Sequence, residues 1–193
     1  MRGRLIAALL VSIGEKGYAA STVADVVRNA HVSKRTFYEH FVDKDACFLA
    51  AYRAVSDGML QTIAASVSED GPWKEQLHAA SRAYLRALEE NAPLTRAFML
   101  EIHVAGPAAL AERRAVHQRF AELLIALSRL AKKKHPELRA LTPAMATALV
   151  GGINELVLVA LEKGDPVKLR DLATTATELA AAVLCHRPLR ASA

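Results

Sequence analysis

Between residues 22 and 44 the apolar positions follow the spacing of two short helices separated by a tight turn. Four small apolar residues of the first predicted helix repeat at the spacing of one buried helical stripe: Val23, Val26, Val27 and Ala30. Phe37 and Phe41 lie one turn apart on a single face of the second. Thr22 and Ser33 precede the two helices as N-caps, whose hydroxyls accept hydrogen bonds from otherwise unpaired backbone N–H groups. The short turn between them is the length that a helix-turn-helix uses to hold a recognition helix against DNA.

Helical spacing, punctuated by Gly and Pro, continues along all 193 residues, and the alternation typical of strands is missing. The composition, 52% apolar but only 5% aromatic, suits helices packed on helices. About nine helices are predicted, over residues 3–16, 23–30, 34–41, 44–66, 72–91, 94–104, 107–134, 143–164 and 166–187. We therefore predict an all-α fold, with a three-helix DNA-binding domain at 1–46 and a larger helical bundle for ligand binding and dimerisation at 47–193.

The helix-turn-helix segment resembles the DNA-binding motif of the tetracycline-repressor (TetR) family of bacterial transcriptional regulators. Ten positions fall in register with that motif: Thr22, Val23, Val26, Ala30, Val32, Ser33, Thr36, Tyr38, Phe41 and Lys44. Two positions depart from it. Val27 replaces the usual Ala, and His31 replaces the usual Gly of the turn, where family members often need a left-handed backbone. His tolerates that conformation better than most residues other than Gly, so we expect a strained turn.

The side chains expected to contact DNA are polar residues on and around the second helix of the motif. They are Thr22, Ser33, Lys34, Arg35, Thr36, Tyr38, His40 and Lys44. Lys34 and Arg35 can donate to O6 and N7 of guanine, and the Tyr38 hydroxyl can donate to a phosphate. The resemblance implies that Thr36, Tyr38, His40 and Lys44 match the family's DNA-contact positions, while Lys34 and Arg35 occupy variable, specificity-setting ones. Taken singly, Lys34 and Arg35 are better explained as solvated charges, and Tyr38 and His40 as packed side chains. Taken together with the turn spacing and the two caps, the group indicates contact with DNA, and for His40 both interpretations stay open.

The last two long predicted helices are apolar on more than one face, and a small protein has few places to bury such a helix. Pairing both helices with their copies across a two-fold axis would make a four-helix interface. Its predicted residues are Leu149, Ile153, Leu156, Val157, Ala160, Leu172, Ala176, Leu179 and Val183. The alternative is a buried central helix in a monomer. Family members dimerise through their last two long helices, so the resemblance also implies a homodimer.

The predicted helix over 44–66 joins the DNA-binding domain (1–46, called the head below) to the helical bundle, and this arrangement suggests a ligand-controlled switch. The candidate effector pocket is largely apolar, as ligand pockets are, with two histidines as its best polar groups. Its residues are Met59, Tyr84, Leu88, Phe98, Met99, Ile102, His103, His117, Phe120 and Leu124. The alternative for each of them is plain core packing.

Catalysis is not indicated, because the chain lacks a Gly-rich phosphate loop, a nucleophile elbow and an H-E-x-x-H motif. One E-x-x-H pair, Glu75 to His78, is too little for a di-metal site, so we predict no enzyme, metal or cofactor. The net charge of +5 is compatible with DNA as partner. Two distant cysteines, Cys47 and Cys185, favour a reduced, cytoplasmic protein.

Residues 1–13 mimic a secretory signal, but we interpret them as the first helix, since cleavage would remove the support of the helix-turn-helix. The most apolar stretch, 144–161, is interrupted by Asn154 and Glu155, so no membrane partner is expected. The predicted function is a ligand-released repressor that binds a palindromic operator as a homodimer, nucleoid-associated when bound. Alternatives are a ligand-independent DNA-binding activator or architectural protein, a helical-bundle metal enzyme, or a secreted helical protein.

Overall fold

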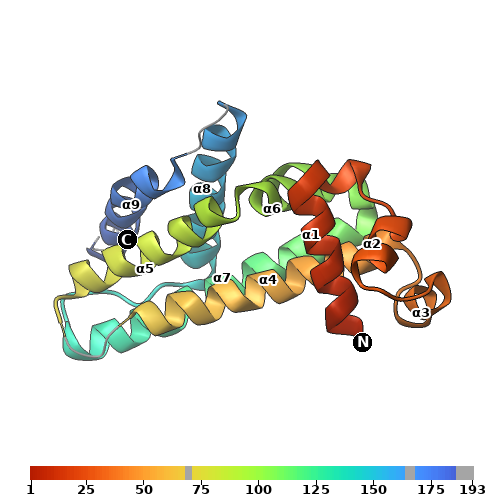
Figure 1. Cartoon of the computed structure of the whole chain (residues 1–193). Helices are drawn as coiled ribbons and strands as arrows, with labels where there is room; N and C mark the ends of the chain where they lie inside the picture. The colour runs from red at the N-terminus through yellow and green to blue at the C-terminus, as the bar shows by residue number, and fades with distance from the viewer. Residues whose placement is uncertain (68–70, 164–167, 186–193) are drawn as a thin grey trace. The chain divides into compact units, whose positions relative to one another are not determined.

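The computed structural model describes residues 1–67, 71–163 and 168–185, apart from the side chains of residues 103 and 104. These residues are helical with no strand among them, so the all-α prediction is confirmed (Figure 1). The α-helices are α1 Arg2–Ala20, α2 Val23–Asn29, α3 Lys34–His40, α4 Lys44–Ser66, α5 Trp73–Glu90, α6 Ala92–Arg96, α7 Pro107–Lys134, α8 Pro143–Glu162 and α9 Ala173–Cys185.

Three segments differ in detail from the predicted helices. The predicted helix over 94–104 is divided into the end of α6, a π-helix η1 (Ala97–Glu101) and a 3-10 helix η2 (Ile102–Ala105). The predicted ninth helix starts as a 3-10 helix η3 (Leu169–Leu172), and its predicted ends at 166 and 187 lie outside the described residues. In α1, Gly17 has φ +79°, which interrupts the helix close to its predicted end.

The chain forms two compact units. The first consists of Met1–Met59 with Leu88–Val116, and the second of Leu60–Ala87 with the described residues from His117 onwards. The first unit is built around α1, whose buried face includes Leu5, Leu9 and Ile13. The predicted domain boundary at residue 46 stays a prediction.

Aromatic rings complete the core of the first unit. Tyr18 of α1 stacks on Phe48 of α4 with ring centroids 3.9 Å apart. Phe98 of η1 packs against Phe48 and Tyr52 of α4, in each case with centroids 5.2 Å apart. The end of α1, the start of α4 and η1 therefore share one packed aromatic cluster, and burying such rings is a large contribution to stability.

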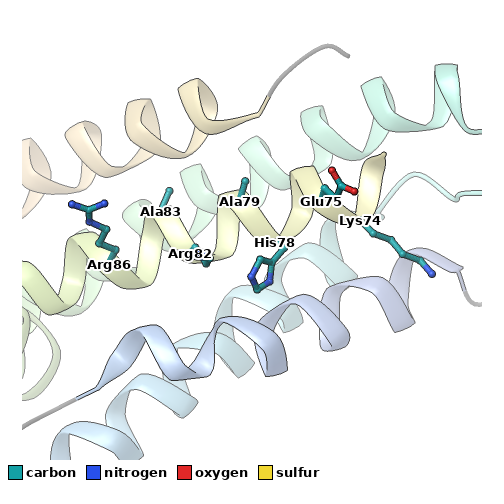
Figure 2. Close-up of a pocket in the computed structure, with 7 residues that line it drawn as sticks. All are labelled: Lys74, Glu75, His78, Ala79, Arg82, Ala83 and Arg86. Atoms are coloured by element: carbon teal, nitrogen blue, oxygen red, sulfur yellow. The ribbon is translucent and has the colours of Figure 1, made fainter. Parts of the chain in front are cut away.

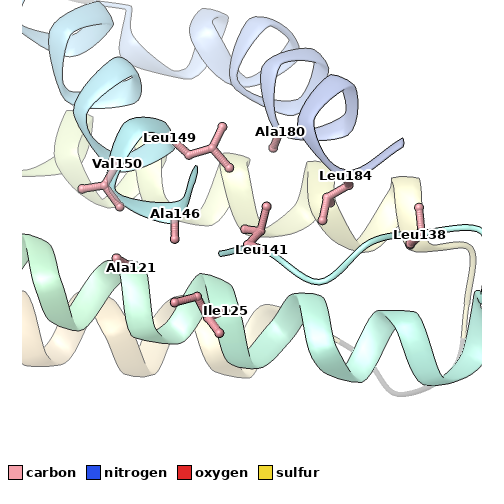
Figure 3. Close-up of a cluster of buried hydrophobic side chains, with 9 residues drawn as sticks. All are labelled: Ala121, Ile125, Leu138, Leu141, Ala146, Leu149, Val150, Ala180 and Leu184. Carbon is pink, nitrogen blue, oxygen red and sulfur yellow. The ribbon is translucent and has the colours of Figure 1, made fainter. Parts of the chain in front are cut away.

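The second unit has its own hydrophobic core, drawn in Figure 3. Its buried members come from α7, α8, α9 and the α7–α8 connection: Ala121, Ile125, Leu138, Leu141, Ala146, Leu149, Val150, Ala180 and Leu184. Two backbone N–H groups fix the connection, because Arg139 N–H donates to the Leu184 carbonyl at 3.0 Å and Leu141 N–H donates to the side-chain Oγ of Ser128 at 3.0 Å.

Helix α8 is the one described helix long and apolar enough to cross a membrane by length and composition, with mean hydropathy 1.8 over its most apolar window. The helix starts at the predicted Pro143, with Thr142 Oγ1 accepting from Met145 N–H at 3.3 Å. Leu149, Val157 and Leu161 on its inner face are buried within the chain. Only 33% of the residues in this window are buried, so the rest of α8 is half-buried or exposed in the described chain.

Candidate DNA-binding site

Helix α2 begins with a capping box. Thr22 Oγ1 accepts from the Asp25 N–H at 3.2 Å, and Asp25 Oδ2 accepts from the Thr22 N–H at 2.9 Å. The Thr22 hydroxyl also donates to Asp25 Oδ2 at 2.7 Å. The predicted N-cap is confirmed, with a carboxylate partner that the sequence pattern did not single out. The Thr22 hydroxyl is thus engaged inside the protein, and its contact with DNA stays a prediction.

The buried Asp25 carboxylate holds α1 and α2 together. Lys16 Nζ of α1 donates to its Oδ2 at 2.6 Å, and Arg28 Nη2 of α2 donates to its Oδ1 at 2.8 Å. The hydrogen bonds from Lys16, Thr22 and Arg28 hold the pKa of Asp25 well below its usual range, against the opposing effect of burial. This carboxylate therefore stays ionised and fixes the orientation of the α2 N-terminus on α1.

The turn between α2 and α3 contains a residue in the left-handed backbone conformation, as the resemblance to the TetR motif predicted. His31 has φ +49°, the one positive φ of a non-glycine residue in the described chain. The turn is closed by backbone hydrogen bonds, with His31 N–H donating to the Arg28 carbonyl at 3.1 Å and Val32 N–H to the Val27 carbonyl at 3.0 Å. The turn therefore forms with His in the place of Gly, at the cost of a strained backbone.

Helix α3 presents a polar face on the side opposite its buried aromatic residues. Phe37 and Phe41 are buried, as predicted, whereas 56% of Tyr38 is exposed. Lys34 and Arg35 are exposed in the first turn, and Arg35 Nε donates to Glu39 Oε1 at 3.3 Å. The side chains predicted to read bases are thus gathered on one accessible surface.

The remaining α3 residues are partly engaged in local contacts. Ser33 caps the helix, since its Oγ accepts from the Thr36 N–H at 3.1 Å and lies 3.0 Å from Thr36 Oγ1. His40 is half-buried, and its carbonyl accepts from Arg2 Nη1 at 3.2 Å. The predicted caps are confirmed, and the DNA contacts of Ser33, Thr36 and His40 stay predictions.

Lys44 lies at the start of α4 but is directed toward the end of α1. Its Nζ donates to the carbonyls of Tyr18 at 3.0 Å and Ser21 at 2.9 Å, and lies 4.1 Å from the centroid of the Tyr18 ring. The Tyr18 hydroxyl in turn donates to Asp45. Lys44 therefore has a structural role that the sequence did not predict, and one remaining ammonium proton for a phosphate.

Known proteins are similar both to the helix-turn-helix segment and to the fold of the whole chain. Residues 5–51 match the family model of bacterial regulatory proteins, tetR family. This segment contains the helix-turn-helix just described and is similar to the DNA-binding domains of that class. The predicted resemblance is confirmed, because the match covers the whole helix-turn-helix segment.

Solved structures share the fold of the whole chain. FadR of Bacillus subtilis, a transcriptional regulator solved in complex with stearoyl-CoA, is similar with a TM-score of 0.78 and 17% identity over 95% of this chain and 100% of its own. The fatty acid degradation regulator FadR of Bacillus halodurans is similar with a TM-score of 0.78 and 21% identity, over 96% of this chain and 97% of its own. The TetR family regulator PfmR of Thermus thermophilus is similar with a TM-score of 0.65 and 22% identity, over 92% of this chain and 96% of its own. At these identities the likeness establishes the fold, an N-terminal helix-turn-helix with a helical C-terminal part.

The predicted effector residues fall into both compact units, each described by itself. In the first unit Leu88, Phe98 and Ile102 are buried, and Met59 and Met99 are half-buried. The side chain of His103 lies outside the described residues.

In the second unit the Tyr84 and Phe120 rings pack with centroids 5.8 Å apart, and Leu124 packs on the hydrophobic core. His117 Nε2 lies 3.5 Å from Nδ2 of the buried Asn154. An effector pocket formed by these residues stays a prediction.

A groove that sequence analysis missed runs along α5 (Figure 2). Its lining comes from one face of that helix: Lys74, Glu75, His78, Ala79, Arg82, Ala83 and Arg86. Figure 2 shows His78 pointing toward α9, where its Nδ1 lies 3.3 Å from Thr177 Oγ1. The sequence contains a signal for this groove, because basic residues repeat at every fourth position from Lys74 to Arg86. The sequence analysis used only the E-x-x-H pair within that repeat. Among the described residues no group of three or more His, Cys, Asp or Glu is placed to hold a metal ion.

The predicted interface residues differ in exposure. Leu149, Val157 and Ala176 are buried within their own chain, and their part in a dimer interface stays a prediction. The half-buried ones are Ile153, Leu156, Ala160, Leu172 and Val183, and 37% of Leu179 is exposed. Val159 of α8, not predicted, is 38% exposed. These half-buried and exposed residues of α8 and α9 are the ones that a second copy of the chain could contact.

Proposed function

We propose that the chain is a transcriptional regulator that binds a palindromic operator as a homodimer and releases it when a small effector binds. The observation that carries the DNA-binding part is the exposed polar face of α3. Lys34, Arg35 and Tyr38 are accessible on it, while Phe37 and Phe41 anchor its other side. A recognition helix held in this way can offer its N-terminal side chains to base edges in the major groove.

The dimer proposal is supported by the uncovered apolar surface of α8 and α9. Val159 and Leu179 are large apolar side chains exposed on these helices, beside the half-buried Ile153 and Leu156. Leu179 lies against Gly152 of α8, since a Cβ on Gly152 would be in ordinary contact with Leu179 Cδ2 at 3.5 Å. A two-fold interface covering this surface would present two heads to half-sites about one helical turn of DNA apart.

The effector proposal is supported by the fold shared with a regulator solved with stearoyl-CoA. We propose a largely apolar effector, and a long-chain acyl-CoA is the first compound to test. Such a ligand shifts the protein toward its released state only by its differential affinity for the two states. The chain then acts in the bacterial cytoplasm, associated with the nucleoid when bound to DNA, as a regulator without enzymatic activity.

The test of DNA binding is a titration of the purified protein against the DNA flanking its own gene and against random DNA, across a salt series. Selective binding that weakens with salt is the expected result. Equal, weak binding to both DNAs at all salt concentrations would contradict sequence-specific regulation by this head. Sedimentation of the free protein tests the dimer, with Leu179→Glu expected to give a monomer.

The effector proposal is tested on the protein–DNA complex. Stearoyl-CoA is added, with coenzyme A alone as the control, and release of the DNA and the thermal stability of the protein are measured together. Stabilisation of the protein with release of DNA by the acyl compound alone supports the proposal. Binding of DNA that no acyl-CoA changes contradicts this choice of effector and favours ligand-independent regulation.

A further inference from the structure

The groove along α5 carries an excess of positive charge. Its lining includes four basic residues at every fourth position: Lys74, His78, Arg82 and Arg86. Residues four apart in a helix lie one above the other on the same face, about 6 Å apart along the axis. Like charges in this arrangement repel each other, and a solvated helix face usually alternates the two signs of charge. The lining holds a single carboxylate, that of Glu75, so the groove favours an anion.

Arg82 offers its guanidinium to an outside partner. It is exposed, and within the described part of the chain it makes no hydrogen bond or ion pair. The side chains three and four positions away on α5 are apolar or basic, so no carboxylate of its own helix can pair with it. Lys74 is also exposed, and its Nζ lies 5.6 Å from the centroid of the Trp73 ring. Arg86 also interacts within the chain and is not needed for the site.

His78 is held in one orientation by α9. Its Nδ1 lies 3.3 Å from Thr177 Oγ1, and the Thr177 hydroxyl donates to the Ala173 carbonyl at 2.6 Å. Because the hydroxyl proton is engaged there, Oγ1 accepts from His78, and the ring proton is assigned to Nδ1. The lone pair of Nε2 is therefore left for a ligand. Figure 2 shows Lys74 and His78 on one side of α5 and Glu75 on the other, so the carboxylate is turned away from them.

The groove has room for a small molecule. Its volume is about 530 Å³, within the roughly 300–1,000 Å³ of ligand pockets. Ala79 and Ala83 line it together with the basic side chains, and such short side chains leave space above the helix. The candidate apolar effector residues are not among its lining, so this groove is separate from the predicted effector pocket.

We propose that this groove binds the phosphate groups of a small anionic ligand. The guanidinium of Arg82 matches the oxygens of one phosphate with two parallel hydrogen bonds, and Lys74 adds a point charge. His78 Nε2 accepts from a phosphate hydroxyl, or takes up a proton when the anion binds beside it. Bound phosphate also relieves the repulsion among the basic side chains. The inference goes beyond the proposed function, because it requires neither DNA nor the apolar effector.

The test is a calorimetric titration of the full chain at low, constant ionic strength with two probes, inorganic pyrophosphate and adenosine diphosphate. The first offers linked phosphates alone, and the second offers them on a nucleoside. We expect saturable binding, which Arg82→Gln should weaken about tenfold, the loss for one charge-assisted partner. Equal affinities for the two probes assign free phosphates to the groove, and tighter binding of adenosine diphosphate assigns a nucleotide. Both outcomes support the site.

Three further variants separate this site from a general effect of charge. Arg129→Gln is the matched control, since Arg129 is exposed on α7 and does not line the groove. Lys74→Gln should weaken binding of both probes. Thr177→Val removes the acceptor of His78 without a change of charge and should weaken binding less than Arg82→Gln does. Melting temperatures of all variants without ligand show whether each one folds.

Three results would overturn the inference. One is the absence of binding by either probe at millimolar concentration. Another is binding that Arg82→Gln and Lys74→Gln leave unchanged, which would indicate an adventitious ion only. The third is an equal loss in Arg82→Gln and Arg129→Gln, which would mean that net charge alone attracts the probes. No DNA is present in these titrations, so the proposed function stands or falls separately.

Discussion

Lys44 Nζ lies 3.0 Å from the Tyr18 carbonyl oxygen and 4.1 Å from the centroid of the Tyr18 ring. The ammonium therefore adds a second donor to the Tyr18 carbonyl, which also accepts from the Ser21 N–H at 3.1 Å, in the last turn of α1. A cation at a helix C-terminus also interacts favourably with the helix dipole. The first residue of α4 is thus hydrogen-bonded to Tyr18 in the last turn of α1.

Lys44→Met should lower protein stability as well as DNA affinity. The substitution removes the Lys44 donor from the carbonyls of Tyr18 and Ser21, of which Tyr18 keeps the Ser21 N–H, at a cost of about 1–3 kcal/mol. Chemical denaturation and DNA titration of the same samples measure both effects. Lys34→Met is the control, because Lys34 is exposed and should affect DNA binding alone. A Lys44→Met protein as stable as wild type would contradict the structural role.

Local features of the head were predictable from sequence, and features that join distant segments were not. The caps at Thr22 and Ser33 and the burial of Phe37 depend on neighbours within one helical turn, which a spacing pattern contains. The partners of Lys44 lie 26 and 23 residues away, and those of Asp25 include Lys16 on another helix. Such contacts follow from how the helices pack, which no local pattern specifies.

The helical bundle shows the same limit. Apolar stripes on the last helices predicted their existence, yet the pattern alone could not separate Leu149 and Val157, which fill the protomer core, from Val159 and Leu179, which are exposed. A helix that is apolar on several faces gives the same signal for both uses. The basic groove along α5 was overlooked for a related reason, because repeated charges usually mark a solvated helix face.

Asp25→Asn should destabilise the head at neutral pH, and the difference from wild type should shrink in acid. The folded-state pKa of Asp25 lies below its unfolded value, mainly through the hydrogen bond from Lys16. Its stabilising effect is therefore complete above the unfolded pKa of about 4 and is lost as the pH falls below it. Melting curves of both proteins from neutral pH downward measure this. Glu15→Gln, exposed on α1, is the control, and a constant difference across pH would contradict the assignment.

His31→Gly should leave the protein as stable as wild type or more stable, by up to about 1 kcal/mol. Relief of the left-handed strain at φ +49° is partly offset by the greater backbone entropy of Gly in the unfolded chain. His31→Val should be destabilising, since a β-branched side chain fits this conformation poorly. Urea denaturation gives both values. A His31→Gly protein less stable than His31→Val would show that the imidazole itself supports the turn.

Cys47 should be inert toward thiol reagents in the folded protein. Burial raises the pKa of Cys47 to about 12, against a smaller lowering by the charge of Arg2, and the reactive thiolate is scarce at neutral pH. Cys185 is exposed and should react at once. Mass spectrometry after a short alkylation should find one label per chain, and two after unfolding in denaturant. Rapid labelling of Cys47 in a folded Cys185→Ser protein would contradict its burial.

Arg35→Ala and Tyr38→Phe should weaken DNA binding in different ways. Arg35 is placed at the N-terminal end of α3, with its side chain 90% exposed apart from the pair with Glu39, so its loss should leave stability unchanged. A guanidinium that reads one guanine contributes about 1–3 kcal/mol to the free energy of binding the operator, and its removal should relax specificity at that base pair.

Tyr38→Phe removes a phosphate donor and should weaken binding to operator and random DNA alike. Titrations of both variants on an operator with single base changes separate the two roles. If Arg35→Ala lost equal affinity on operator and random DNA, Arg35 would be a backbone contact, and the reading of bases would pass to Lys34.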